Sequence, residues 1–167
     1  MPRGFTLLEV IIATFILTIG AVGVFTLVTH TTRFSSTATN QLVASYLAQE
    51  GVEIVRNIRD TNFVRIRKGV PGATWKDGLT GCAAMCEADY NDSSLTPVGS
   101  LNQLLLNGIR YTYDSGVPSP FPFARNIAVT INGPDTKMDV LVEVSWQERQ
   151  TTRSVKAATE LYKWLAP

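Results

Sequence analysis

Side chains that most enzymes rely on are scarce in this sequence. Its 167 residues include one histidine, two cysteines and three methionines, and charged residues make up only 17%, against about 25% in an ordinary soluble domain. There is no Ser/His/Asp set, no glycine-rich phosphate loop and no HExxH pattern. The single histidine, His30, lies just after a long apolar run and cannot anchor a conventional triad. We therefore expect a protein that is not an enzyme, not even a membrane-tethered hydrolase, with no metal and no cofactor.

A strong overall charge is also missing. Fifteen basic and fourteen acidic side chains leave a net charge of +1, so no global field points to nucleic acid or to an acidic partner. The apolar residues, in contrast, are concentrated at one end of the chain. From Val10 to Val28 the sequence has no charged residue at all.

The apolar run predicts a membrane-spanning helix. From Phe5 to Val28 it is interrupted only by Glu9, and as a helix it would be roughly 36 Å long, enough to cross a hydrocarbon core. It is too long for a secretory signal, and no A-x-A cleavage site follows it. Arg3 precedes the run and favours a cytoplasmic N-terminus, with the rest of the protein outside the cytoplasm. An uncleaved single-span anchor is the simpler alternative.

Glu9 needs an explanation because it lies inside that apolar run. A carboxylate in a membrane span costs about 2.5–3.5 kcal/mol near the centre and less near the end. Glu9 is therefore either a tolerated interfacial acid or the partner of a cation. If the chain is cut between Gly4 and Phe5, the new α-amino group of Phe5 is such a cation. It lies one turn away in the same helix, or beside Glu9 of a neighbouring helix shifted by about one turn.

These residues carry a family resemblance. The stretch Gly4-Phe5-Thr-Leu-Leu-Glu9-Val10, after a short basic leader, resembles the processing site of type IV pilins and type II secretion pseudopilins. The resemblance is strong over residues 1–28 and weaker afterwards. It implies that a prepilin peptidase cuts after Gly4 and methylates the Phe5 amine. It also implies that Glu9 guides each subunit into a helical filament.

The resemblance also implies partners and a location. Before assembly the subunit would lie in the cytoplasmic membrane, in contact with lipid and with an inner-membrane platform protein. After assembly its N-terminal helix would contact other pilin subunits in a surface or periplasmic filament. The stretch from Ile19 to Gly23 is similar to minor pilins and lacks the proline of many major pilins. Gly20 and Gly23 permit either local unwinding or close helix packing.

A second, amphipathic helix segment is predicted for residues 29–59. Apolar residues recur at three- and four-residue steps from Val43 to Ile58, with Gly51 on the same stripe. We expect this stripe to pack against a sheet, with Gly51 marking a close approach.

Both cysteines lie in the region 69–100, which is rich in turn signals and predicts an irregular loop. Outside the cytoplasm, Cys82 and Cys86 favour a local disulfide over a metal site. The acidic stretch 87–93 matches a calcium loop poorly, since it lacks the glycine and the closing glutamate. We interpret it as a solvated turn.

The last third predicts an antiparallel sheet within residues 107–165. Segments 109–113, 126–131, 140–146 and 153–164 alternate in polarity and suggest about four strands. The expected fold is α+β and pilin-like: a transmembrane-to-stalk helix packed on this sheet. The expected organisation is a cleaved leader (1–4), a transmembrane half (5–28), an amphipathic half (29–59) and an extracytoplasmic head (60–167).

A cluster of basic residues is the basis of a second interpretation. A candidate nucleic-acid patch consists of Arg56, Arg59, Arg65, Arg67 and Lys68, as a DNA-binding competence pilin would need. Asp60 interrupts the cluster, and basic runs are usually solvated surfaces. DNA is therefore not the expected partner, and the pilin or pseudopilin interpretation stands first.

Overall fold

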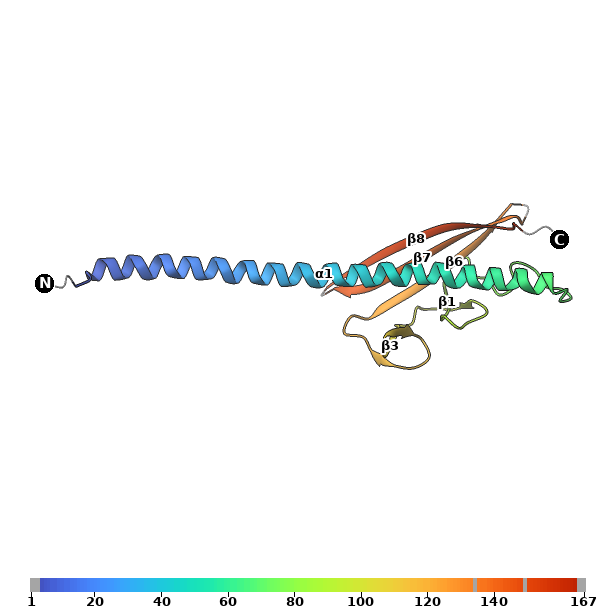
Figure 1. The fold of residues 1–167 in the computed structure, drawn as a ribbon, viewed down its shortest axis with the longest axis horizontal. Helices are drawn as coiled ribbons and strands as arrows, with labels where there is room; N and C mark the ends of the chain where they lie inside the picture. Colours follow the sequence, from blue (N-terminus) through green and yellow to red (C-terminus); the bar gives the residue numbers. More distant parts are fainter. Residues whose placement is uncertain (1–3, 134, 149, 165–167) are drawn as a thin grey trace. The chain divides into compact units, whose positions relative to one another are not determined.

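The computed structural model describes residues 4–133, 135–148 and 150–164, and it contains one helix followed by short and long strands (Figure 1). The elements are α1 (Leu7–Arg67), β1 (Cys86–Glu87), β2 (Thr96–Pro97), β3 (Leu105–Asn107), β4 (Arg110–Thr112), β5 (Val117–Pro118), β6 (Phe123–Asn132), β7 (Lys137–Glu148) and β8 (Thr151–Tyr162). The chain divides into two units, the first ending at Thr39 and the second beginning at Asn40. The helix with its antiparallel sheets has the α+β layout expected from the sequence, and this layout is consistent with a pilin-like fold.

The first unit is helical from Leu7 onward and buries none of its described side chains. Large apolar side chains such as Phe15 and Phe25 are more than half exposed. Its threonine hydroxyls donate hydrogen bonds to backbone carbonyls of the same helix. Thr14 and Thr18, for example, donate to carbonyls four residues earlier at 2.9 Å. This pattern suits a lipid environment, because polar groups there must find partners within the segment.

The second unit contains the rest of α1, and here one face of the helix is buried. The stripe includes Ala44, Leu47, Ala48, Val55 and Ile58, which recur at the three- and four-residue steps of an amphipathic helix. These positions pack into one hydrophobic core with the inward side chains of the long strands.

The helix ends at Arg67, beyond the residue 59 expected from the sequence. Phe63 explains the extension, because it is buried and its ring lies 6.5 Å from that of Trp75 and 4.7 Å from that of Trp164. The helix ends just before Gly69, which has a positive φ of 69° and so does not continue the helix. Its amide donates to the Ile66 carbonyl at 2.9 Å, closing the last turn.

The main sheet has three antiparallel strands in the order β6-β7-β8. Phe123 lies opposite Trp146 at one end of the β6–β7 pair, and Asn132 lies opposite Lys137 at the other. In β6 the odd-numbered residues from Phe123 to Val129 are buried, so this face of the sheet meets α1. The alternation predicted for these strands is present.

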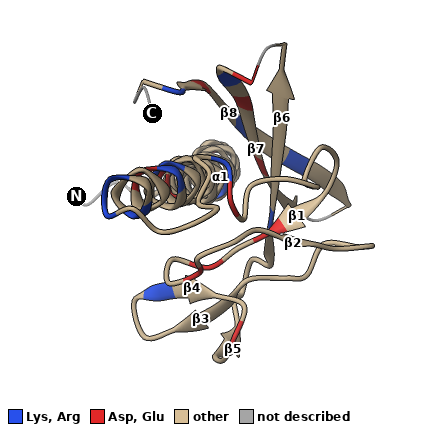
Figure 2. Ribbon diagram, turned by 90° about the vertical axis from the view of Figure 1, so that its right-hand side faces the viewer, with Lys and Arg blue, Asp and Glu red and all other residues tan. Residues whose placement is uncertain are grey.

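The strand expected at 109–113 does not join this sheet. The part of this segment that forms a strand is β4, and it pairs with β3 in a separate small sheet of order β4-β3-β5. Figure 2 shows this sheet as a layer apart from β6–β8. The outer edge of β6 is already occupied. The amide of Val129 donates to the Cys82 carbonyl, and the Phe123 carbonyl accepts from Leu104, both at 2.7 Å. A fourth strand therefore has no free edge to pair with there.

Gly51 is the point of closest approach between α1 and the sheet. A Cβ atom on this residue would lie 2.7 Å from Cγ1 of Val142 and 3.2 Å from Cδ of Arg125. Both distances are shorter than ordinary carbon contacts. The close approach expected from the sequence is confirmed.

Arg125 is a buried charge that sequence reasoning did not identify. Its side chain is fully buried on the inward face of β6 and donates to the carbonyls of Ala88 at 2.8 Å and Leu47 at 3.4 Å. It also forms an ion pair with Glu50 at 3.2 Å. Tyr113 donates its hydroxyl to the Arg125 carbonyl at 3.1 Å. One arginine therefore joins the helix, the sheet and the loop before Tyr90.

Gly51→Ala should destabilise the second unit. Alanine favours a helix by about 1 kcal/mol over glycine, but overpacking against Val142 costs about 1–3 kcal/mol, so we expect a net loss. Denaturant titration of the full chain in detergent, followed by tryptophan fluorescence, measures it. Gly99→Ala is the control, because a Cβ added at Gly99 would meet no atom within 4 Å. A Gly51→Ala protein as stable as the parent would contradict the close contact.

Alkaline pH should weaken the fold through Tyr113. Burial raises the pKa of its phenol to about 12, although the nearby Arg125 guanidinium favours the charged form. The unfolded chain ionises near pH 10, so above that pH the folded state holds the extra proton. The free energy of unfolding should fall between about pH 10 and 12, by on the order of 2 kcal/mol.

Tyr113→Phe should remove that fall, while Tyr90→Phe, at a half-exposed tyrosine, should keep it. The measurement is denaturant titration of the three proteins from about pH 8 to 12. An equal decline in all three would show that Tyr113 does not cause it.

Candidate functional site

The segment around the predicted cleavage site is built by a helix cap. Thr6 immediately precedes α1, and its side-chain Oγ1 accepts a hydrogen bond from the Glu9 amide at 3.3 Å. Its carbonyl accepts from the Val10 amide at 3.2 Å. The Glu9 amide also donates to the Thr6 carbonyl at 3.1 Å. Thr6 is thus the N-cap residue, and α1 begins at Leu7.

Glu9 also lies in the first turn of the helix that this cap begins, a position that sequence reasoning missed. Thr6-Leu-Leu-Glu9 matches the capping-box pattern, in which a threonine caps the helix and a glutamate follows three residues later. An acid in the first turn also stabilises the positive end of the helix dipole. The spacing of Thr6 and Glu9 is the sequence signal that indicates this role.

The same cap leaves the predicted scissile bond outside the helix. Gly4 is exposed, and Phe5 is 82% exposed. The bond between them is therefore accessible, and its amide is not tied into the helical hydrogen-bond ladder. The preceding leader residues Met1–Arg3 lie outside the described residues.

The helix that follows fits membrane anchoring. Among the described residues, α1 is the one helix long and apolar enough to cross a bilayer, and its apolar window is not buried in the protein. Gly20 and Gly23 are helical, and a Cβ on either would meet no atom within 4 Å. The isolated chain therefore has no break at these glycines, and their faces are free for contact with lipid or other helices.

The five basic residues of the candidate nucleic-acid patch differ widely in their surroundings. Arg59 is buried and forms an ion pair with Asp60 at 2.8 Å. Arg56 forms an ion pair with Glu53. Carboxylates therefore neutralise much of the positive charge along this part of α1.

One further carboxylate contact follows the same trend at the end of the helix. Arg65 lies 3.4 Å from Asp77. A hydrogen bond from the Thr74 side chain is the main cause that lowers the pKa of Asp77, and Arg65 adds to it. Only Arg67 and Lys68 of the patch are exposed without an ion pair among residues 4–133, 135–148 and 150–164. Two adjacent cations are a small footprint for phosphate binding.

Cys82 and Cys86 form the disulfide expected from the sequence, with Cα atoms 5.6 Å apart, and both residues are buried. The closed loop lies along β6. The Asn126 side chain donates to the Ala84 carbonyl at 3.2 Å and accepts from the Cys86 amide at 3.3 Å. The short loop that the disulfide closes therefore lies along the outer edge of β6.

The acidic stretch 87–93 is not the solvated turn that the sequence suggested, because Glu87 and Asp89 are buried. Glu87 accepts hydrogen bonds from the backbone and side-chain amides of Asn102. Asp89 accepts from the Thr112 hydroxyl and, at 3.0 Å, from the Tyr113 amide. These acids hold the loops together, and no cluster suited to a metal ion occurs in the part of the chain that the structure describes.

Comparison with known proteins identifies the N-terminal region. Residues 2–28 match the family model described as the prokaryotic N-terminal methylation motif. Neither the search of curated proteins nor that of solved structures gave a match. The matched range includes the Gly4–Phe5 bond, the Thr6 cap, Glu9 and the apolar half of α1. The chain therefore carries the prepilin-processing signature of type IV pilins and pseudopilins.

Proposed function

We propose that the chain is a minor pilin or pseudopilin: a structural subunit that is processed by a prepilin peptidase and assembled into a type IV pilus or a related filament. The methylation motif supports the general assignment to pilin-like proteins. The observation that supports the structural role is the first half of α1, which carries large apolar side chains and buries none of them. Such a surface requires lipid before assembly and the helices of other subunits afterwards.

Processing would act on the exposed Gly4–Phe5 bond. Water adds across this amide, Gly4 leaves with the leader as a carboxylate, and Phe5 gains a free α-amino group. The same enzyme would then transfer a methyl group from a sulfonium methyl donor to this amine, which loses one proton while the donor leaves as a thioether. The Thr6 cap leaves two residues, Phe5 and Thr6, between the bond and the start of α1 at Leu7, so cleavage does not require unwinding of α1. The leader, residues 1–4, thus keeps the amine blocked until the subunit is in the membrane.

The new amine then changes the energetics of Glu9. A single carboxylate in lipid is costly, and so is a single ammonium group. Subunits shifted by about one helical turn bring the two groups together and neutralise both charges. The helix dipole favours Glu9 and disfavours the ammonium group at the same end. Pairing with the Glu9 of a neighbour therefore adds a directional contact to an otherwise uniform apolar interface.

The second unit, in this proposal, is the head outside the cytoplasm. The disulfide is consistent with an oxidising compartment. The inner-membrane platform protein would extract the subunit from lipid, and other pilin subunits would replace that lipid around α1. The competence-pilin alternative with DNA as ligand has less support, since three of the five candidate basic residues contact carboxylates.

Mass spectrometry of the protein from its native cells should show a chain that begins at Phe5 with one added methyl group. Gly4→Val should keep the leader, because a branched side chain replaces the small residue before the bond. A parent chain that still starts at Met1 or Pro2 in cells with an active prepilin peptidase would refute the proposed processing.

Glu9→Gln should be inserted and cleaved normally but should be lost from sheared filaments, because it keeps the shape of the side chain and removes its charge. Glu9→Asp is the matched control and should retain part of the incorporation. Immunoblots of membrane and filament fractions measure both. Normal incorporation of Glu9→Gln would show that Glu9 is only an interfacial acid, or that this subunit occupies the tip, where its neighbours differ.

A further inference from the structure

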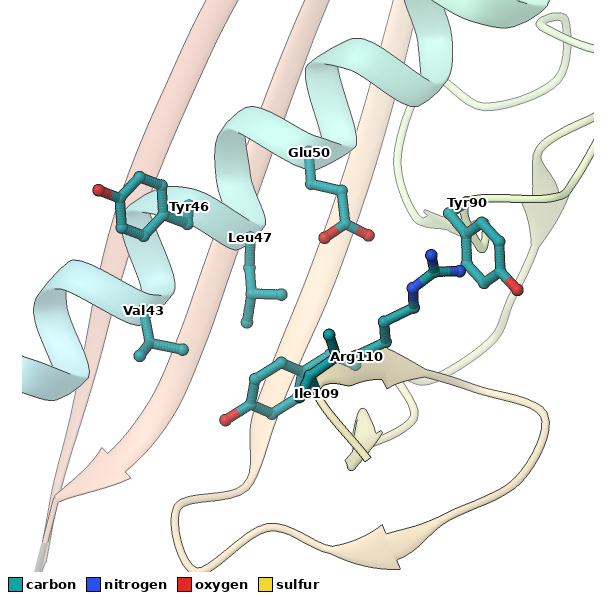
Figure 3. Close-up of a pocket in the computed structure, with 8 residues that line it drawn as sticks. Val43, Tyr46, Leu47, Glu50, Tyr90, Ile109 and Arg110 are labelled. Atoms are coloured by element: carbon teal, nitrogen blue, oxygen red, sulfur yellow. The ribbon is translucent and has the colours of Figure 1, made fainter. Parts of the chain in front are cut away.

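A groove of about 520 Å³ lies between α1 and the β3–β4 hairpin in the second unit (Figure 3). The helix contributes Val43, Tyr46, Leu47 and Glu50, and the opposite wall consists of Tyr90, Ile109, Arg110 and Tyr111. Its lining is aromatic and aliphatic with two charged groups. A concave site of this size and composition is typical of ligand pockets.

Arg110 is the charged group in the groove that forms no ion pair among the described residues. Its guanidinium lies 4.8 Å from the centre of the Tyr90 ring, and Figure 3 shows the side chain pointing toward that ring. Within the described residues it forms no ion pair, whereas Glu50 across the groove is held by the buried Arg125. The positive charge of Arg110 is therefore positioned by an aromatic ring but not neutralised.

A second, polar cavity of about 320 Å³ adjoins the groove and shares Tyr90 and Arg110 with it. It is lined further by Asn107, Thr112, Asp114 and Ser115. Arg110 thus lines both a cavity with amide, hydroxyl and carboxylate groups and a groove with aromatic side chains. A ligand that spans both cavities needs hydroxyl groups, an apolar ring face and a negative charge.

We propose that this site binds a carboxylate-bearing sugar of a surface glycan. The guanidinium of Arg110 would take the sugar carboxylate through paired hydrogen bonds. The electropositive C–H face of the ring would lie on the electron-rich face of Tyr46 or Tyr111. Its hydroxyl groups would donate to the carboxylate of Asp114. An acidic peptide supplies a carboxylate and apolar groups but lacks this row of hydroxyl donors.

Several features hold the site in place before any ligand arrives. Tyr111 packs edge-on against Phe123, with ring centres 5.6 Å apart. Gly108, with a φ of 63°, makes the hairpin turn that leaves Ile109 96% exposed at the rim. Prior order of this kind lowers the entropy cost of binding. The inference rests on the proposed function only in that the head must face the outside of the cell.

The test uses the full chain in detergent micelles and isothermal titration calorimetry. The probes are sialyllactose and a galacturonic acid tetramer, each compared with its neutral counterpart, lactose and a galactose tetramer. We expect one of the acidic sugars to bind, at least tenfold more tightly than its neutral counterpart. The acidic sugar that binds distinguishes a sialic acid from a uronic acid.

Arg110→Gln should weaken that binding about tenfold or more, since it removes a charge-assisted contact. Arg153→Gln is the matched control, because Arg153 is an exposed arginine on β8 that pairs with Glu148. Equal tryptophan-monitored unfolding of both variants excludes misfolding as the cause.

Three results would each overturn the proposal. The first is a neutral sugar that binds as tightly as its acidic counterpart, and the second is no binding of either acidic sugar at several millimolar. The third is an Arg110→Gln protein that binds the acidic sugar as tightly as the parent. Arg110-dependent binding of an acidic peptide or of inorganic phosphate in place of the sugars would do so as well. Filament assembly is scored separately, so a failed titration leaves the structural role intact.

Discussion

The second unit depends on the close contact between α1 and the main sheet at Gly51. Only a residue without a Cβ lets the helix backbone approach Val142 to this distance. The approach brings the Leu47 carbonyl and the Glu50 carboxylate within reach of Arg125, whose charge would otherwise be buried without its carboxylate partner. Arg125 in turn binds the Ala88 carbonyl and so fixes the loop that carries Asp89 and Tyr90.

The two halves of α1 differ in how their apolar side chains are surrounded. From Asn40 onward the helix contributes its apolar stripe to a core, so its stability comes from packing. Before that point none of the described side chains is buried, and the large apolar ones are exposed. This exposed apolar surface fits membrane anchoring, and the Thr6 cap and Glu9 lie at the end of that half. The helix wall of the groove beside Arg110 is formed by the second half of α1, which is packed against the core.

Much of the helix and sheet could be predicted, because both follow from local patterns. The stripe from Val43 to Ile58 and the alternation in β6 each report one buried face. The prediction that placed 109–113 in the main sheet is wrong, because alternation does not specify which edge a strand pairs with. The prediction of solvated acids at 87 and 89 is wrong as well, since the backbone amides and hydroxyls that surround them come from distant loops.

The sequence by itself determined the processing motif, the membrane-length helix and the pairing of Cys82 with Cys86, because each depends on residues close together in the chain. The tertiary structure decided what Arg125, Glu87 and Asp89 do and where Arg110 lies relative to Tyr46 and Tyr90. These side chains act through partners that are up to 78 positions away along the chain. Burial and charge neutralisation are properties of that assembled neighbourhood, and no local pattern of residue types encodes them.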